Sequence, residues 1–509
     1  MNHVSKQSRR FWISNQSSSA AIIGLVTMTL GVACSDASSP AASNGGAPAN
    51  TAGAGGHSGS QSATGSGGKT GSAGTTSTLA GGAPGSAGTF GSGFGGTGGS
   101  VISEGGSFGV AGATAGTGGA TVGGVAGSTG AGGGTIMAGG YPENPGAGCV
   151  TTAGALKADQ TLPDPFAMHD GTRISTKAEW ECRRAEIKKD LETYEIGPKQ
   201  EPTTVAATLS GSQLTVKVSN SSGSLTLTST VSGSGSCVAI AMDSSSTLIS
   251  GCTLIPFNSS QVVMQSQSST QVQSDPFYKL YPSLWGKIGN YSAWAWGVSR
   301  LIDGIEQVKD QLKVDPTKIG VEGCSYAGKM ALFSGALDER VALTVAEESG
   351  GGGINSWRTS QDFTKRTGTS IEKIDNTNYG WFMSSMRTRD PYSLPHDHHE
   401  LIGMIAPRAV VAMGNGDYDW LGDESGYKSI MAATEVFKAW GVADHIGFDF
   451  TSGHPHCQAP ASQIATAKAF VDRFLKGGTS STAIMIKPTS TKFNLDYASE
   501  ITWTTPTLQ

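Results

Sequence analysis

The chain has 509 residues, enough for more than one domain, and a formal net charge of -5 at neutral pH. This balance of charge offers no basic surface of the kind that binds nucleic acid, so nucleic acid is excluded as the expected partner. About half of the 73 glycines lie between Cys34 and Cys149, so the composition changes sharply along the chain.

Residues 1–34 have the pattern of an export signal. Basic residues precede an apolar run from Ala20 to Leu30, which is too short to span a membrane, and small residues follow it. Cys34 comes directly after the small residues and indicates bacterial lipoprotein processing, with a lipid on Cys34 as the one expected membrane contact. Simple cleavage with full secretion is the alternative. Both readings place the protein outside the cytoplasm, either secreted or at the bacterial outer membrane.

Residues 35–140 are predicted to be a disordered linker rich in Gly, Ser, Ala and Thr. Between residues 41 and 140 the charged side chains are Lys69 and Glu104, and aromatic residues are almost absent. Such a stretch cannot bury enough apolar surface to offset the entropy of ordering it. A glycine-rich structural repeat is the alternative, but we find no fixed period of the kind that repeat architectures require.

The globular part is expected at residues 141–480, and it opens with a helix and three strands. An amphipathic helix is predicted for residues 177–193, where Cys182 could anchor it. Alternating polar and apolar residues, separated by Ser/Gly turns, then predict an antiparallel meander with strands at 205–209, 213–218 and 224–231.

From Tyr291 onward, predicted strands alternate with predicted helices. The strands are expected at 319–322, 342–348, 409–413 and 446–451, and the helices at 294–311, 326–337, 427–440 and 461–475. This alternation implies a mostly parallel central sheet covered by helices on both faces, which is a three-layer αβα sandwich. Residues 481–509 are a C-terminal tail for which the pattern predicts no role.

Candidate catalytic residues end or directly follow the predicted parallel strands, at the carboxyl edge where open α/β sheets place their sites. They are Ser325, Glu348, Asp417, Asp419 and His456. The order serine, acid, histidine is that of the α/β-hydrolase fold. The acid is open at this stage, because Glu347 faces away from Glu348 on a strand and either aspartate could replace or supplement Glu348.

The segment at residues 323–328 (Gly-Cys-Ser-Tyr-Ala-Gly) resembles the nucleophile elbow of hydrolases, with one extra residue before its second glycine. A serine hydroxyl becomes a useful nucleophile only when an adjacent imidazole can take its proton, and His456 is the candidate base. Two alternatives remain. Ser325 could simply cap the helix that begins at Tyr326, and His454 could compete with His456.

Apart from Cys34, the chain has an even number of cysteines, as a disulfide framework in an oxidising compartment requires. Many pairings are possible. We favour Cys149 with Cys182, Cys237 with Cys252, and Cys324 with Cys457. The last bond would hold Ser325 and His456 close together, because each is the direct neighbour of a bonded cysteine. It therefore favours His456 over His454 as the base.

Several motifs together resemble the glucuronoyl esterases of carbohydrate esterase family 15. They are the segments at 293–300, 323–329, 348–353, 397–399, 419–422 and 453–458, and they match that family in order and spacing. The resemblance covers roughly residues 145–478. It implies an α/β-hydrolase that needs no cofactor and cleaves esters between 4-O-methyl-glucuronoyl groups of xylan and lignin alcohols.

The same resemblance implies roles for individual residues. Ser325 would be the nucleophile, Glu348 the acid and His456 the base. Lys329 matches the family lysine that hydrogen-bonds the sugar hydroxyls, and Trp420 matches the tryptophan that packs on the sugar ring. Glu372 and Asn378 stand where two other sugar contacts of the family, a glutamine and a glutamate, are found, so the resemblance implies that they also meet the substrate. The favoured Cys149–Cys182 and Cys324–Cys457 bonds also match disulfides of the family.

Tyr326 is the main departure from the family. There an arginine usually follows the serine and helps to stabilise the oxyanion, whereas this chain supplies a tyrosine hydroxyl and the backbone N–H. Loss of one oxyanion donor can cost about 100- to 1000-fold in rate. Two other functions therefore stay open: an esterase for other polysaccharide esters, such as acetyl esters, and a polysaccharide-binding protein with weakened activity.

The histidine-rich run at residues 396–399 suggests a metal site, but the spacing of Asp397 and Glu400 is better explained as a helix capping box. No metal is expected. The expected partner is a polysaccharide ester, and the membrane is expected as a partner only through a lipid on Cys34.

Overall fold

The structure of the protein is a computed structural model that describes residue 143 and residues 148–201, 204–243, 247–268 and 270–509. These residues belong to one of the two compact units of the chain, Gly119–Gln509. The predicted export signal, with Cys34, and the predicted linker lie outside the described residues. In the part of the chain that is described, no helix combines the length and the apolar character needed to cross a membrane.

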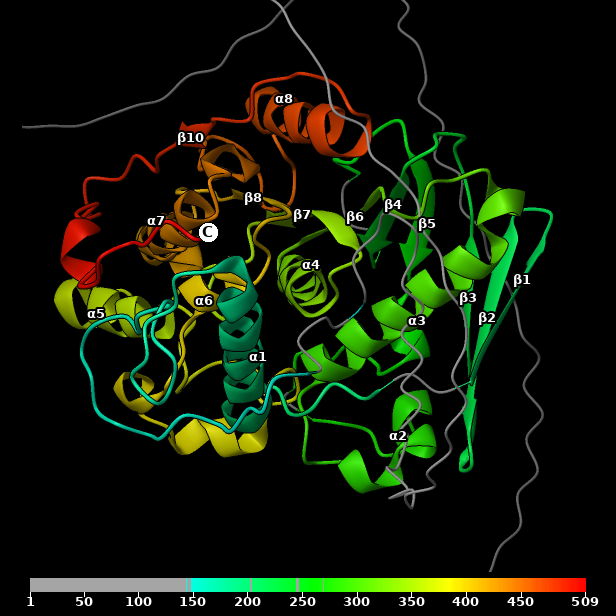
Figure 1. Ribbon diagram of the computed structural model, residues 1–509, viewed down its shortest axis with the longest axis horizontal. Helices are drawn as coiled ribbons and strands as arrows, with labels where there is room; N and C mark the ends of the chain where they lie inside the picture. The colour runs from blue at the N-terminus through cyan, green and yellow to red at the C-terminus, as the bar shows by residue number, and fades with distance from the viewer. Residues whose placement is uncertain (1–142, 144–147, 202–203, 244–246, 269) are drawn as a thin grey trace, which may run out of the picture. The chain divides into compact units, whose positions relative to one another are not determined.

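A seven-stranded sheet forms the centre of the molecule, with strand order β10-β9-β8-β7-β6-β4-β5 and parallel pairing between all neighbours (Figure 1). Its strands are β4 (Val238–Met242), β5 (Thr253–Phe257), β6 (Ile319–Cys324), β7 (Val341–Glu347), β8 (Ala409–Met413), β9 (Ile446–Asp449) and β10 (Met485–Ile486). Strands β4, β6, β8 and β9 are buried along their whole length, and β7 is buried except at Ala342, as strands covered on both faces require.

Both faces of this sheet are covered, so residues along each strand alternate between two hydrophobic clusters. On β8, Val411 and Met413 pack in the cluster that contains Phe470 and Leu475, whereas Val410 and Ala412 pack in the larger cluster on the other face. Helix α8 (Ala461–Phe470) and its π-helical continuation η8 (Val471–Leu475) cover the first face. This arrangement confirms the predicted αβα sandwich.

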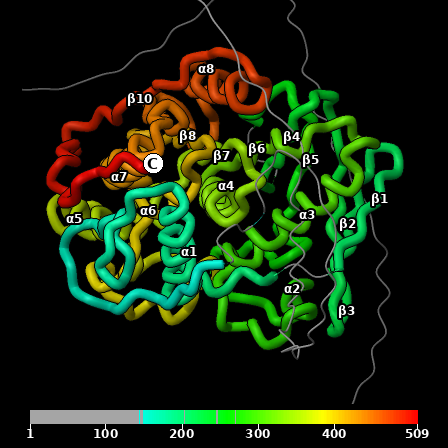
Figure 2. The backbone as a smooth tube through the Cα atoms, viewed as in Figure 1, coloured from blue at the N-terminus to red at the C-terminus, as the bar shows by residue number. Residues whose placement is uncertain are grey.

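The other helices are α1 (Lys177–Tyr194), α2 (Pro276–Leu280), α3 (Asn290–Leu312), α4 (Tyr326–Leu337), α5 (Trp357–Thr367), α6 (His398–Gly403) and α7 (Asp423–Ala439). Short 3₁₀ turns are η2 (Ser259–Gln261), η3 (Pro282–Leu284), η4 (Ser384–Thr388), η5 (Pro391–Ser393), η6 (Asp419–Leu421), η7 (Ala443–His445) and η9 (Ala498–Glu500). Figures 1 and 2 show α3, α4 and α7 on the face of the sheet opposite α8.

The predicted meander is a separate three-stranded antiparallel sheet of β1 (Thr204–Ser210), β2 (Gln213–Asn220) and β3 (Gly223–Thr230). Its inward residues Leu214, Val216 and Val218 are fully buried. Gly304 on α3 lets this sheet approach closely, because a Cβ there would lie 2.2 Å from a methyl group of Val216.

The C-terminal residues after η8 pack on the domain rather than leaving it. Strand β10 extends the central sheet beside β9, and Leu508 is buried in the larger hydrophobic cluster. The chain ends next to α1, where Gln509 N–H donates to the carbonyl of Ser175 at 3.0 Å. Figure 2 traces this last segment from β10 past α5 to the chain end.

Candidate active site

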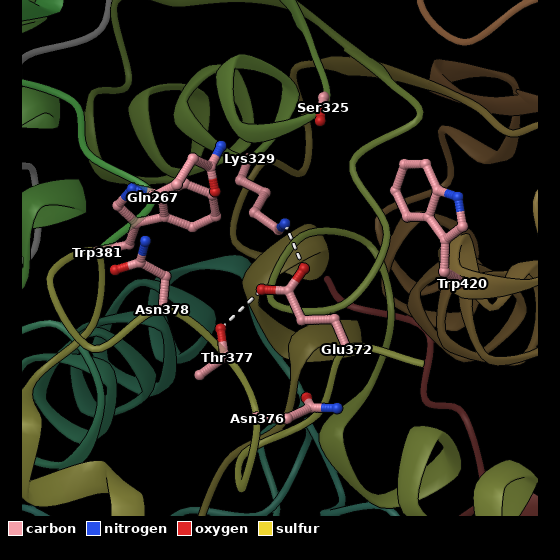
Figure 3. Close-up of a pocket in the computed structure, with 9 residues that line it drawn as sticks. All are labelled: Gln267, Ser325, Lys329, Glu372, Asn376, Thr377, Asn378, Trp381 and Trp420. Carbon is pink, nitrogen blue, oxygen red and sulfur yellow. Dashed lines mark hydrogen bonds and ion pairs between the residues drawn. The ribbon is translucent and has the colours of Figure 1, made fainter. Parts of the chain in front are cut away.

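A pocket of about 380 Å³ lies beyond the carboxyl end of β6, and Ser325 reaches into it (Figure 3). Its lining combines a serine, a charged pair, amides and two tryptophans. The lining residues are Gln267, Ser325, Lys329, Glu372, Asn376, Thr377, Asn378, Trp381 and Trp420. The four positions predicted from the sequence to meet the sugar, Lys329, Glu372, Asn378 and Trp420, are therefore all here.

Ser325 stands on a sharp turn between β6 and α4. Its backbone has φ 59° and ψ −126°, a region that residues with a side chain rarely adopt, and its N–H donates to the carbonyl of Glu347 at 3.0 Å. The turn needs its two glycines, because a Cβ at Gly323 would lie 2.3 Å from the carbonyl oxygen of Ala327 and one at Gly328 would lie 2.5 Å from that of Glu347. The Ser325 side chain makes no capping hydrogen bond to α4, so the alternative of a simple helix cap is not supported.

Glu348 follows β7 and is joined directly to His456. The Glu348 side chain is buried, its Oε2 lies 2.5 Å from His456 Nδ1, and its Oε1 accepts the Cys457 N–H at 3.1 Å. Both carboxylate oxygens thus hold the histidine loop. With Nδ1 bonded to the carboxylate, the imidazole keeps Nε2 for a second partner, which is the arrangement a general base needs.

A disulfide links the two segments that carry the serine and the histidine. Cys324 and Cys457 are bonded with their Cα atoms 5.6 Å apart, although 133 positions separate them in the sequence. The other described cysteines are also bonded as favoured, Cys149 to Cys182 and Cys237 to Cys252.

The alternative acids and the alternative base have other partners. Asp417 accepts the Gly453 N–H at 2.6 Å, and Asp419 pairs with Lys492. His454 is buried, and its Nε2 lies 2.8 Å from the carbonyl of Thr451. Its Nδ1 lies 3.7 Å from Glu348 Oε1, much farther than the 2.5 Å between His456 Nδ1 and Glu348 Oε2. Of the candidates, the geometry therefore joins Glu348 and His456.

The sugar side of the pocket is organised around a salt bridge. Lys329 Nζ lies 2.6 Å from Glu372 Oε2, and the hydroxyl of Thr377 donates to Glu372 Oε1 at 2.7 Å (Figure 3). The same ammonium group sits 5.3 Å from the centroid of the Trp381 ring. Trp420 forms the opposite wall, 46% exposed, with its ring edge-on to His456 at 4.9 Å between centroids.

Sequence reasoning missed several pocket residues, namely Gln267, Asn376, Thr377 and Trp381. All of them lie in connections outside the named helices and strands, so no periodic pattern marks them. Trp381 alone carried a signal, since an aromatic side chain in an irregular segment is a common wall of a sugar site.

The hydroxyl of Tyr326 is bonded to an aspartate rather than free in the pocket. The hydroxyl donates to Asp243 Oδ2 at 3.0 Å, and the ring stacks on Trp381 with centroids 5.9 Å apart. Burial and the nearby charge of Asp243 raise the pKa of Tyr326, so the group stays protonated. The side chain thus links α4 to the residue that follows β4, and the oxyanion role of the Tyr326 backbone N–H stays a prediction from the sequence.

The histidine-rich run is buried at the start of α6, and the predicted capping box is present there. Asp397 and Glu400 form that box, and the rings of His396 and His398 both bind the buried carboxylate of Glu195, at 2.9 and 2.8 Å. Among the described residues, the groups of possible metal ligands that lie closest together include Cys324, whose sulfur is already in a disulfide.

The chain is similar in sequence to known glucuronoyl esterases. A family model for fungal glucuronyl esterases matches residues 214–441. The 4-O-methyl-glucuronoyl methylesterase of Schizophyllum commune is 38% identical over 371 residues, which is 69% of this chain and 92% of that protein. The enzyme of the same name from Neurospora crassa is 38% identical over 73% of this chain and 92% of its own length. The chain belongs to the glucuronoyl esterase family.

Solved structures of this family share the fold. The glucuronoyl esterase from Sporotrichum thermophile is 36% identical, covers 71% of this chain and all of its own (100%), and superposes with a TM-score of 0.66. A serine-to-alanine mutant of that enzyme was solved in complex with methyl 4-O-methyl-beta-D-glucopyranuronate, and it matches this esterase with 35% identity, the same coverage (71% and 100%) and a TM-score of 0.65. The α/β-hydrolase fold expected from the sequence is therefore that of the family.

Proposed function

We propose that the protein is a serine ester hydrolase that cleaves 4-O-methyl-glucuronoyl esters, such as those that link glucuronoxylan to lignin alcohols. One observation carries the proposal: Ser325 opens onto a pocket whose walls offer a charged pair and a tryptophan, and the Cys324–Cys457 disulfide ties its turn to the loop of His456, which is bonded to Glu348. The names of the relatives, and the methyl glucuronate ester bound by one of them, support the same substrate class.

In the proposed reaction, Ser325 Oγ attacks the ester carbonyl while His456 Nε2 takes its proton. The backbone N–H of Tyr326 donates to the oxyanion of the tetrahedral intermediate. His456 then returns the proton to the departing alcohol, which leaves a glucuronoyl ester on Ser325. His456 then takes a proton from water as the water oxygen attacks this ester, and it returns the proton to Ser325 Oγ when the glucuronic acid leaves. Glu348 holds the imidazole in one tautomer and stabilises its protonated form.

The pocket walls explain selection for a sugar acid. Lys329 and Glu372 present a cation and a carboxylate within one salt bridge, so together they can donate to and accept from neighbouring sugar hydroxyls. Trp420 offers a half-exposed ring that can pack on the apolar face of a pyranose.

The site of action follows from the N-terminal pattern and the disulfides. We place the enzyme outside the cytoplasm, because the described cysteines are all bonded and disulfides persist in oxidising compartments. Lipid attachment at Cys34, with residues 35–140 as the tether, would hold it on the cell surface. Mass measurement of the mature N-terminus distinguishes this from release after simple cleavage.

The decisive assay is release of glucuronic acid from its benzyl ester by the wild-type protein and by Ser325→Ala. We expect hydrolysis by the wild type and a loss of at least about 1000-fold in the variant. A panel that includes acetylated xylan tests the second candidate, which the tyrosine at position 326 favours. Turnover of acetyl esters without any glucuronoyl ester would overturn the proposed substrate.

A further inference from the structure

Residues 492–494, in the segment that follows β10, reach the loop that carries a wall of the pocket. After β10, the chain passes α5 (Figure 1), and Lys492 then meets the loop between β8 and α7, residues 414–422. Here the Lys492 ammonium pairs with the carboxylate of Asp419. Asp419 is the immediate neighbour of Trp420, which lines the pocket together with Ser325.

Residues 492–494, which we name the C-terminal clamp, are fixed independently of that ion pair. The Phe493 ring packs edge-on against Phe363 of α5 with centroids 6.0 Å apart, and the Asn494 N–H donates to Glu424 Oε2 at 2.7 Å. Arg366 completes the junction, because its guanidinium donates to the Lys492 carbonyl at 3.2 Å and pairs with Glu424. The Lys492 side chain therefore extends from backbone that is already held.

Trp420 needs support from its loop. Its side chain is 46% exposed, so few side-chain contacts define its position. On one side the loop is anchored by Asn355, whose Nδ2 donates to the carbonyls of Leu421 and Gly422 at 2.7 and 3.1 Å. On the other side, the loop is anchored by the Asp419 side chain, which pairs with Lys492.

The loop also reaches the proposed base. The Tyr418 hydroxyl accepts the His456 N–H at 3.0 Å, and the Trp420 ring contacts the imidazole. Residues 418–420 thus connect the C-terminal clamp to both the sugar wall and the histidine.

We propose that the C-terminal clamp is a positioning element of the active site, in which Lys492 acts through Asp419 to hold Trp420 against the bound sugar ring. The proposal rests on the proposed function in one respect, since it takes the glucuronoyl ring as the group that Trp420 meets. Lys492 is a positioning residue and touches no reacting atom.

Steady-state kinetics on benzyl glucuronate test the proposal, with Lys492→Met as the variant. We expect KM to rise about three- to tenfold with kcat within about twofold of wild type, because binding is lost without loss of the catalytic groups. Lys492→Arg should restore KM, since it keeps the charge. Asp419→Asn, which removes the other partner, should reproduce the effect of Lys492→Met.

The chain offers a matched control at a second ion pair of the tail. Glu500 of η9 pairs with Lys428 of α7 at 2.8 Å, and neither lines the pocket. Glu500→Gln should leave KM unchanged. An equal rise of KM in Glu500→Gln and Lys492→Met would overturn the proposal, because it would indicate general loosening of the tail.

A double-mutant cycle with Trp420→Ala tests the route of the effect. If Lys492 acts through Trp420, adding Lys492→Met to Trp420→Ala should change KM no further. Independent, multiplicative effects would contradict the proposal.

Amide hydrogen exchange separates this proposal from the proposed function, because it needs no substrate. Peptides covering residues 415–424 should exchange faster in Lys492→Met than in wild type and at the wild-type rate in Glu500→Gln. Unchanged exchange in Lys492→Met would overturn the clamp even if the enzyme hydrolyses glucuronoyl esters. Conversely, failure of the wild type to hydrolyse any such ester would remove the proposed function and leave the exchange result to decide the clamp.

Discussion

Glu348 has a backbone φ of 41°, and Ser325 and Cys457 have φ values of 59° and 61°, all in the left-handed region. Side chains other than glycine rarely adopt this region, and it costs free energy that the rest of the fold must offset. These strained residues meet at one point, where the serine turn, the acid and the histidine loop converge. Backbone strain of this kind clusters at functional sites, so its position here agrees with the candidate active site.

The choice of acid is tested by Glu348→Gln with Asp417→Asn as its matched control. A glutamine would present an amide N–H₂ or a neutral oxygen to His456 Nδ1, so the favoured tautomer and the support for the protonated ring would be lost. We expect kcat to fall about 1000-fold or more. Asp417 binds only the backbone of Gly453 in the histidine loop, so Asp417→Asn should keep kcat within about tenfold of wild type.

Equal losses in the two variants would contradict this assignment of the acid. Thermal unfolding of each variant provides the stability control, since Glu348 also accepts a hydrogen bond from the Cys457 backbone.

Tyr326→Phe tests whether the tyrosine hydroxyl takes part in the reaction. Since this hydroxyl donates to Asp243, its removal should cost stability, by about 1 to 2 kcal/mol, and should leave kcat/KM within about threefold of wild type. A loss of 100-fold or more without unfolding would instead identify the hydroxyl as an oxyanion donor. Kinetics and chemical denaturation on the same preparations distinguish the two outcomes.

At the scale of elements, the sequence predicted best where the pattern was long and periodic. Helix α1 and strands β1 to β3 were predicted nearly to their ends, and α4 and β8 were predicted to the residue. The start of α3 was placed four residues late, because its first turn, Asn290–Ala293, follows the extended residue Gly289 with no side-chain cap to mark it. The start of α7 was also placed late, since Gly422 with φ 66° precedes a polar first turn.

Other elements were missed for identifiable physical reasons. Strands β4 and β5 are five residues each and stand among Ser/Gly-rich segments, so a short apolar run gave no period to measure. Helix α5 is mostly polar, and it is held by tertiary contacts such as those of the buried Trp357. Strand β10 has two residues and exists only because β9 offers its edge.

The residues of the candidate site likewise fall into those that a sequence pattern could predict and those that it could not. Ser325, Glu348 and His456 could be found because each follows a predictable strand, and the disulfide between Cys324 and Cys457 then brings two of their neighbours together. Lys329 lies one turn into α4 and was reached through the family motif. Gln267 and Thr377 could not be found, because only the folded chain brings their segments to the pocket.

For the whole molecule, the carboxyl edge of the sheet gathers several buried acids, and two of them have strongly raised pKa values. Burial, together with the charge of Glu348, raises the pKa of Asp423 to about 8. Burial raises the pKa of Glu322 to about 8 as well, although two backbone N–H groups donate to it. Both groups are thus protonated in the folded protein at neutral pH.

This predicts a loss of stability on the alkaline side. An aspartate in the unfolded chain titrates near 3.8, whereas Asp423 in the folded protein titrates near 8, so between these values the folded state binds the extra proton. The contribution to the free energy of unfolding is therefore complete below about pH 4, falls as the pH rises and is lost above about pH 8. Thermal unfolding midpoints from pH 5 to pH 9 should decline less in Asp423→Asn than in wild type, because the amide stays neutral throughout.

Asp310→Asn is the matched control, since Asp310 is exposed on α3 and its substitution should leave the pH profile of the wild type unchanged. Glu322→Gln should flatten the decline in the same sense as Asp423→Asn, and the double variant should flatten it further, because the two carboxyls lie on different elements, β6 and α7. A decline as steep in Asp423→Asn and in the double variant as in wild type would contradict the assignment of the proton to these buried acids. The alkaline limit of the enzyme would then have to arise elsewhere in the fold.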